Sequence, residues 1–192
     1  VDSFFKNAGG LIDKITSIKT RELLKFYLDQ ARLYLTKDEE INQDLTEQAH
    51  QSAEAARLMT IPGFGPLTAL CFIAVVDEIN RFPDARRFGA YLGLVPREFS
   101  SGGKQRLGAI TRSGPEMLRR YMIHGARSVL MRSGPRLAED PNKKWAERVQ
   151  SRSNTNKAVV ALAHKNARIA FGLMKHQSDY DPKHARKLNE SV

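Results

Sequence analysis

The centre of the chain carries a serine among glycines and cations. Ser101 is followed by two glycines, and Lys104, Arg106 and Arg112 come shortly after it. The glycines leave the serine hydroxyl unshielded and allow backbone N–H groups to converge on an anion. The three cations supply the positive charge that binding a phosphodiester requires. The pattern predicts that Ser101 is a catalytic nucleophile aimed at DNA phosphate, and that Lys104, Arg106 and Arg112 bind DNA.

A solvated turn serine is the alternative for Ser101. The sequence has no Gly-x-Ser-x-Gly elbow and no nearby pairing of histidine with aspartate of the kind that serine hydrolases use. A serine attacks phosphorus when cations or metal ions neutralise the phosphate and another group takes its proton. The cations are close in sequence, whereas the sequence identifies no base.

A second candidate site is a Pro-Gly-Phe-Gly turn that begins at Pro62. Residues 58–70 match a helix-hairpin-helix, in which an apolar helix end leads through a glycine turn to a helix that starts near Pro66. We expect Gly63 and Gly65 to bind DNA. Both glycines are expected at positive φ, so that N–H groups of the turn and of the new helix bind one phosphate without reading base sequence. A plain connector between two helices is the alternative.

A predicted helix over residues 115–131 adds two further cations. Leu118 and Met122 recur at helical spacing and are expected to face inward, whereas Arg119 and Arg120 are expected on or beside the polar flank. We therefore expect Arg119 and Arg120 to bind DNA as well.

The charge of the chain is unevenly distributed. The formal net charge of the 192 residues is +10. Residues 1–80 contain 8 lysines and arginines against 12 acidic residues, whereas residues 81–192 contain 23 against 9 and so carry a net charge of +14. This asymmetry is typical of a polyanion-binding domain attached to a segment with another role.

Residues 1–57 are expected to form a helical linker or coiled-coil arm. Leucine and alanine recur there at helical steps, at Leu24, Leu28, Ala31, Leu35, Leu45, Ala49 and Ala56. The acidic run at residues 38–40 lies between the two sets and indicates a break or a polar patch. Two interpretations stay open: a helical hairpin packed on its own domain, and an extended arm that pairs with a partner subunit.

Beyond the arm the sequence predicts a mainly all-α helical bundle that contains the helix-hairpin-helix. Helices are expected at residues 66–76, 85–92, 115–131, 145–152 and 156–175, the last as the central core helix, with a loop or short ribbon at residues 97–111. The corresponding domain spans residues 58–181, and residues 182–192 form a polar tail.

Metal and membrane sites find little support in the sequence. Asp77 and Glu78 are adjacent and so diverge by roughly 100 degrees on a helix. The histidines lack the His-x-x-x-His or Cys/His spacing of zinc sites, and His124 and His164 are expected to pack or cap. Cys71 lies among apolar neighbours, and no apolar run reaches the roughly 20 residues of a membrane span. We expect no metal bound by this chain and a soluble, intracellular protein.

A series of ordered motifs extends over most of the chain. They are residues 61–65 (IPGFG), 82–83 (FP), 91–97 (YLGLVPR), 100–104 (SSGGK), 106–108 (RLG), 110–112 (ITR), 118–120 (LRR), 124–127 (HGAR) and 156–168 (NKAVVALAHKNAR). In these motifs the chain resembles the IS-one-ten group of insertion-sequence transposases, also called DEDD transposases or bridge recombinases.

The resemblance implies a C-terminal transposase domain whose serine, at the position of Ser101, becomes covalently joined to DNA. It implies an N-terminal RuvC-like domain, outside this sequence, whose four acidic residues bind a divalent metal, expected to be Mg²⁺. Residues 1–57 look like the linker that helps assemble a homo-oligomer. A structured guide, or bridge, RNA is a further implied partner, and the expected location is the bacterial cytoplasm, in association with the nucleoid.

Two functions of other classes stay open. One is a non-catalytic helix-hairpin-helix module that binds DNA in a repair or recombination complex. The other is an RNA-binding accessory domain, which would have the same basic half but would prefer structured RNA to duplex DNA.

Overall fold

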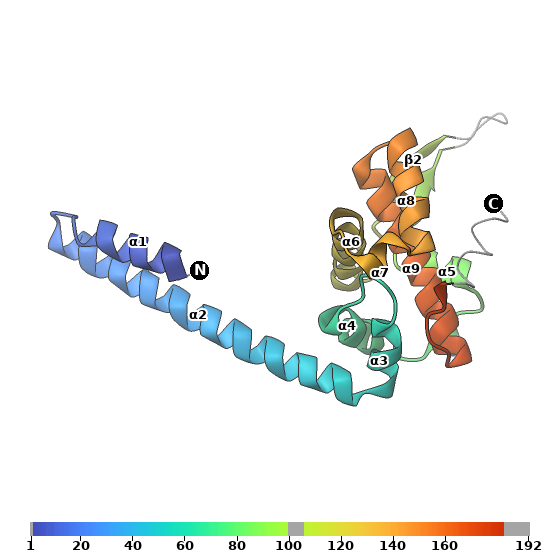
Figure 1. Cartoon of the computed structure of the whole chain (residues 1–192), viewed down its shortest axis with the longest axis horizontal. Coiled ribbons are helices and arrows are strands. Elements are labelled where there is room, and N and C mark those ends of the chain that lie inside the picture. Colours follow the sequence, from blue (N-terminus) through green and yellow to red (C-terminus); the bar gives the residue numbers. More distant parts are fainter. Residues whose placement is uncertain (1, 100–105, 183–192) are drawn as a thin grey trace. The chain divides into compact units, whose positions relative to one another are not determined.

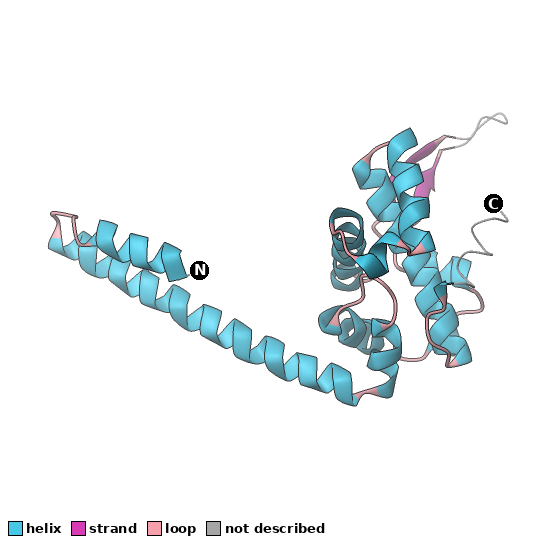
Figure 2. Cartoon of the chain, in the orientation of Figure 1, coloured by secondary structure: helices cyan, strands magenta, loops and turns pink. Residues whose placement is uncertain are grey.

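The protein is mostly helical, with one two-stranded ribbon (Figures 1 and 2). The computed structural model describes residues 2–99 and 106–182. Contacts divide the chain into two compact units, Val1–Leu45 and Thr46–Val192. The mainly all-α prediction is confirmed. Within the described residues, no helix combines the length and the apolar character that spanning a membrane requires.

The first unit is a hairpin of α1 (Asp2–Ile12) and the long helix α2 (Ile18–Gln51), of which the part up to Leu45 belongs to this unit. The connection is fixed by polar contacts: the Arg21 guanidinium donates to the Ile15 carbonyl at 3.1 and 2.6 Å, and Lys25 pairs with Asp13 at 2.8 Å. Further along, the Arg32 guanidinium lies over the Phe5 ring, 5.3 Å from its centroid.

The polar run at residues 38–40 does not interrupt α2. Lys37 donates to Glu40 and Asn42 donates to Asp38, so these exposed side chains pair along one continuous helix. The polar-patch interpretation of this run is therefore confirmed and the break is wrong. The chain leaves helical structure at residues 13–17 and again at Ser52.

The second unit begins with the end of α2 and with α3 (Ala53–Met59). The Ser52 hydroxyl caps α3 by accepting from the Ala55 N–H at 3.2 Å. Ala49, Ala55 and Leu58 are fully buried, so this segment is part of the core of the unit. Ala56, expected on the apolar stripe, is exposed because the break at Ser52 shifts the register by one residue.

The remaining elements follow in one direction along the chain. They are α4 (Pro66–Val76), the 3-10 helix η1 (Ile79–Arg81), α5 (Ala85–Tyr91), β1 (Pro96–Glu98), β2 (Leu107–Ile110), α6 (Glu116–Met131), α7 (Pro135–Ala138), α8 (Pro141–Arg152) and α9 (Thr155–His176). α9 contacts α3, α5, α6 and α8, which confirms the prediction of a central core helix (Figure 1). Its face of small residues allows this, since Ala158, Ala163 and Ala167 are fully buried.

The segment after α9 folds back onto the unit through Tyr180. Its hydroxyl donates to Asp140 at 2.7 Å and accepts from the Asn142 amide at 2.8 Å, and its backbone N–H donates to the Thr60 hydroxyl at 3.0 Å. Burial and the hydrogen bond to Asp140 hold the pKa of Tyr180 well above its usual range. Asp140 also caps α8 by accepting from the Lys143 N–H, so one buried carboxylate joins the start of α8 to the segment after α9.

Candidate nucleic-acid interface

The turn between α3 and α4 lies directly against α6. Gly63 has φ +93°, and a Cβ atom there would lie 2.8 Å from the Gly125 carbonyl oxygen. A Cβ atom on Gly125 would in turn overlap the Gly63 carbonyl. The Asn166 amide, from α9, donates to the Pro62 carbonyl at 2.9 Å and fixes the turn from another side. Gly63 and Gly125 are therefore required by the backbone contact itself.

Gly65 differs from Gly63 in conformation and surroundings. It is the N-cap of α4 with φ −91° and ψ 176°, so the expectation of positive φ at Gly65 is wrong. It is exposed, and no atom lies within 4 Å of the position of a Cβ atom. Packing therefore does not require a glycine here. A glycine leaves open the approach to the first N–H groups of α4, those of Leu67 and Thr68, which have no acceptor within the helix.

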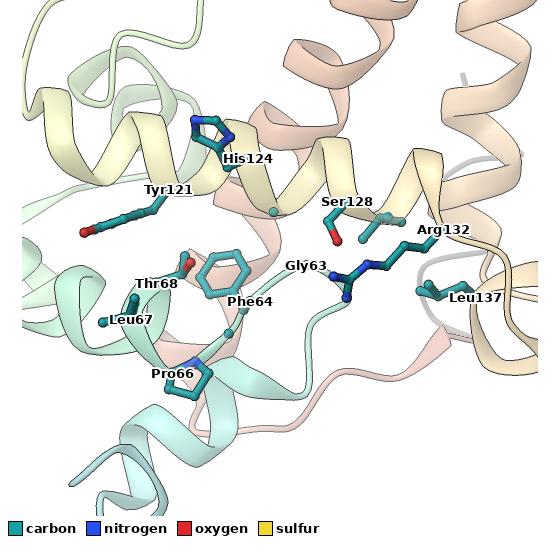
Figure 3. Close-up of a pocket in the computed structure, with 13 residues that line it drawn as sticks. Gly63, Phe64, Pro66, Leu67, Thr68, Tyr121, His124, Ser128, Arg132 and Leu137 are labelled. Atoms are coloured by element: carbon teal, nitrogen blue, oxygen red, sulfur yellow. The ribbon is translucent and has the colours of Figure 1, made fainter. Parts of the chain in front are cut away.

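An open pocket of about 500 Å³ lies between this turn and α6 (Figure 3). One wall consists of the turn and the first residues of α4; the other includes His124, Ser128 and Arg132 from α6 and its C-cap. These three side chains lie four residues apart and so share one helix face. Figure 3 shows the Arg132 side chain extending back over the turn beside Gly63. N–H groups, a hydroxyl and a guanidinium together suit an anion such as a phosphate.

The residues on the α6 side of the pocket were not predicted from the sequence. From the sequence, His124 is expected only to pack or cap, and no role is predicted for Ser128 or Arg132. In the structure His124 and Arg132 are exposed, and all three residues line the pocket. The four-residue spacing of these polar residues predicts that they share one helix face. It does not predict a ligand site, because the sequence does not show that the turn between α3 and α4 lies opposite this face.

Two antiparallel strands, β1 and β2, flank Ser101 in the sequence and pair as a ribbon. Pro96 pairs with Ile110 and Glu98 with Leu107, so β2 contains one extra residue between the two pairs. Both strands are exposed apart from Ile110, which is half-buried. The described residues of the range 97–111 therefore form a short ribbon, which was one of the two sequence expectations for this range.

The base of the ribbon is anchored by close backbone contacts. Arg112 has φ +58°, and its N–H donates to the Gly93 carbonyl at 3.2 Å. A Cβ atom on Gly93 would lie 2.6 Å from the Ser113 nitrogen, and one on Gly114 would overlap the Tyr91 carbonyl. The segment before α6 thus packs closely against the end of α5, and this contact fixes the position of the base of the ribbon.

Arg119 does not lie on the polar flank of α6, and that prediction is wrong. Its side chain is 6% exposed, and its guanidinium donates to the Leu92 carbonyl at 3.2 Å and to the Ser113 carbonyl at 2.7 Å. These carbonyls belong to the same junction between α5 and the ribbon base. Arg119 is therefore engaged in holding this junction together rather than presented to a ligand.

The remaining site residues divide as follows. Ser101 and Lys104 lie outside the described residues. Arg106 directly precedes β2, Arg112 follows it, and both are exposed; Arg120 is exposed on α6. Gly63 and Gly65 lie in the turn. The structure thus forms two groups of candidates, one on the ribbon and its base and one at the pocket over the turn.

Positively charged side chains also lie close together on α8 and α9. Lys165 lies over the Trp145 ring at 4.4 Å, and burial together with the nearby Arg168 and Arg148 lowers the pKa of Lys165 to about 8. His164 is half-buried, and its ring packs on α5 at Gly89. Burial, with Arg168 as a smaller cause, lowers the pKa of His164.

The chain is similar to transposases of insertion sequences. Residues 55–140 match the family described as Transposase IS116/IS110/IS902 family. The matched region contains the turn, the pocket and the ribbon.

Three relatives illustrate the similarity. A "Probable family 20 transposase" from Pseudomonas aeruginosa is 34% identical over 84% of this chain and 47% of its own length. The "Transposase for insertion sequence element IS1111A" from Coxiella burnetii is 39% identical over 76% of this chain and 40% of its own length. A protein of insertion element IS110 from Streptomyces coelicolor is 26% identical over 65% of this chain and 29% of its own length. The chain thus spans less than half the length of these relatives.

Proposed function

From the match of residues 55–140 to the Transposase IS116/IS110/IS902 family, we propose that the chain is the DNA-binding, serine-bearing part of a DNA transposase of this family. In this proposal the ribbon group and the pocket over the turn both bind the DNA backbone. Ser101 supplies the nucleophile for strand cleavage and exchange.

The observation that carries this proposal is the anchored ribbon. Gly93, Gly114 and the buried Arg119 fix its base, and the strands extend from it with exposed cations on both sides of residues 100–105. A rigid base under an exposed cationic segment is suited to hold a phosphodiester in one place. A solvated turn would not need three close backbone contacts at its base.

The proposed chemistry is nucleophilic substitution at phosphorus. The Ser101 oxygen loses its proton and bonds to the phosphorus while the bond from phosphorus to a deoxyribose oxygen breaks, and that oxygen takes up a proton and leaves as a hydroxyl. The strand stays attached to the protein through a phosphodiester. Lys104, Arg106 and Arg112 neutralise the phosphate and stabilise the charge that builds up on its oxygens. Attack on this ester by a free deoxyribose hydroxyl then releases the serine and joins the new strand.

The pocket over the turn has the second role in the proposal, which is to hold DNA away from the reacting phosphate. The N–H groups of Leu67 and Thr68 and the Arg132 guanidinium bind one backbone phosphate there without reading the sequence. Arg120, exposed on α6, adds a further phosphate contact. Such a contact fixes the register of the duplex relative to the ribbon.

We also propose the wider assembly. A RuvC-like domain with four acidic residues, outside this sequence, would hold Mg²⁺ and supply metal chemistry to the same reaction. A guide RNA would select the DNA, and the protein would act as a homo-oligomer. The first unit supports the last point, because large apolar side chains on α2, among them Phe26, Leu33 and Tyr34, are more than half exposed.

The test is Ser101→Ala in the full-length transposase. We expect loss of the covalent protein–DNA adduct and of strand transfer, with DNA affinity near that of the wild type, because one hydroxyl is removed and no charge is lost. The adduct is measured by denaturing electrophoresis with labelled DNA. The present chain alone is expected to bind DNA and to cleave poorly or not at all.

Ser100→Ala is the matched control, since it removes the same group one residue away. An adduct that survives Ser101→Ala and is lost with Ser100→Ala would assign the chemistry to Ser100. An adduct that survives both substitutions would contradict a serine nucleophile. It would favour the second candidate function, a non-catalytic helix-hairpin-helix module for DNA or RNA, which the pocket over the turn supports independently.

A further inference from the structure

The β1–β2 ribbon has one face that combines cations with an aromatic ring. The Phe99 N–H donates to the Arg106 carbonyl at 2.9 Å, so these two residues lie opposite each other. Side chains alternate along a strand, and residues directly opposite share a face. Arg97, Phe99, Arg106 and Gly108 therefore lie together, and we refer to them as the cationic face.

The opposite face of the ribbon has a different chemistry. It contains Pro96, Glu98 and Leu107, of which Glu98 and Leu107 are a direct cross-strand pair. Leu107 is 56% exposed. The ribbon thus offers an internal comparison, since a large apolar side chain is exposed on each face and arginines accompany only one of them.

Phe99 is held in place without being covered. A Cβ atom on Gly108 would lie 3.0 Å from Cε2 and 3.6 Å from Cδ2 of Phe99, so one edge of the ring rests on the ribbon where position 108 has no side chain. The ring is nevertheless 64% exposed. An aromatic ring that is oriented by the opposite strand and open to solvent is prepared to stack on a planar group.

The charges around the ring indicate which planar group fits. Arg97 is exposed and uses one guanidinium N–H on the Thr111 carbonyl, at 3.3 Å, which orients the side chain and leaves further donors. Arg106 is exposed at the opposite strand. A ligand with π faces and closely spaced negative charges is a nucleic-acid strand. Its bases must be unpaired, because paired bases are stacked within the duplex and offer no free face.

We propose that Phe99 stacks on an unpaired base of a single DNA strand whose phosphates are bound by the arginines of the cationic face. This inference rests on the proposed DNA-transposase function and deepens it. Phe99 is two residues before Ser101 in sequence. It acts as a positioning residue: a stacked base fixes the strand near the proposed nucleophile and keeps the duplex from closing there.

The test is binding of the chain to a single-stranded oligonucleotide that contains 2-aminopurine, whose fluorescence is quenched by stacking. We expect the wild type to quench it. Phe99→Ala should abolish the quenching and weaken single-strand binding by about 5- to 150-fold, the range for loss of one base–aromatic stack. Phe99→Trp should retain both. Phe99→Leu should lose the quenching, because it keeps an apolar side chain without a π face.

Leu107→Ala is the matched control on the opposite face and should bind and quench as the wild type does. Thermal unfolding establishes that each variant is folded. Wild-type behaviour of Phe99→Ala, full quenching by Phe99→Leu, or an equal loss in Leu107→Ala would overturn the inference. A changed sedimentation coefficient of Phe99→Ala with unchanged DNA affinity would also overturn it, because the ring would then contact protein. A larger loss of affinity for RNA than for DNA in Phe99→Ala would overturn it as well.

Arg97→Ala separates this inference from the proposed function. If Arg97→Ala loses DNA affinity while Phe99→Ala does not, the stacking is overturned and DNA binding by the ribbon stands. If neither variant loses affinity, the proposed DNA role of the ribbon fails together with the stacking.

Discussion

At the scale of single residues, two glycines of one turn have different physical reasons to be glycine. Gly63 combines φ +93° with a backbone contact to α6, whereas Gly65 has an ordinary extended conformation and open space around it. A side chain at Gly63 therefore disturbs the fold. A side chain at Gly65 disturbs mainly what approaches from outside, with a small cost at the N-cap of α4.

This difference gives a prediction for paired variants. Gly65→Val should lower DNA affinity by about tenfold or more, the loss of one charge-assisted hydrogen bond, while costing about 1 kcal/mol of stability at the N-cap of α4. Gly63→Val should destabilise the unit by at least about 2 kcal/mol, because strain and backbone overlap add. Thermal unfolding and titration with duplex DNA measure the two effects. Wild-type affinity in Gly65→Val would identify the turn as a plain connector.

Residue identities alone could not separate these two glycines. The Pro-Gly-Phe-Gly pattern predicts the turn, but positive φ at Gly63 depends on the approach of Gly125, which is far away in sequence. The burial of Arg119 was unpredictable for the same reason, since it depends on residues that are distant in sequence. Its neighbour Arg120 is exposed and belongs to the same charged motif, and only the carbonyls of Leu92 and Ser113 make position 119 buried.

At the scale of elements, the first unit is notable for what it leaves exposed. α1 covers little of α2, and Leu23, Phe26, Tyr27, Leu33 and Tyr34 are all more than half exposed. A helix that were only a solvated linker would not gain from so much apolar surface. These residues are the basis for proposing that the unit associates with a second copy.

Sedimentation of the chain tests this proposal. The wild type should associate with increasing concentration, and a variant with Phe26→Ser and Leu33→Ser should sediment as a monomer of unchanged helix content. A deletion should end at Leu45, because removal of residues 1–57 would also take Ala49 and Ala55 out of the core of the second unit. If wild type and variant are both monomers, the exposed stripe has no role in self-association.

Helix periodicity predicted most elements, including the central position of α9, because three to five turns of apolar spacing are a strong local signal. The end of the arm was harder to predict. Ala49 and Ala56 both fit the helical spacing of the apolar residues. The sequence does not show that Ser52 ends one helix and caps the next, because a serine can cap a helix or lie within one.

At the scale of the whole molecule, the two parts of the chain differ in net charge. The net charge of +14 over residues 81–192 predicts DNA binding that depends strongly on salt and little on sequence. If about six phosphates are neutralised, affinity for an unrelated duplex should fall about a thousandfold between 50 and 200 mM salt. Fluorescence anisotropy at several salt concentrations measures the slope. A flat response would contradict an electrostatic interface.

The hydrogen bond between the Asn166 amide and the Pro62 carbonyl joins residues 104 positions apart. A ribosome that has just released the turn must therefore continue for several seconds, at about 5–20 residues per second, before the partner of that turn exists. Until α9 emerges, α3, α5 and α6 each lack one of the helices on which they pack. The unit thus depends on a contact that is distant in sequence and does not close before α9 has been made. A nascent or truncated chain that lacks α9 therefore also lacks the hydrogen bond that fixes the turn at one wall of the pocket.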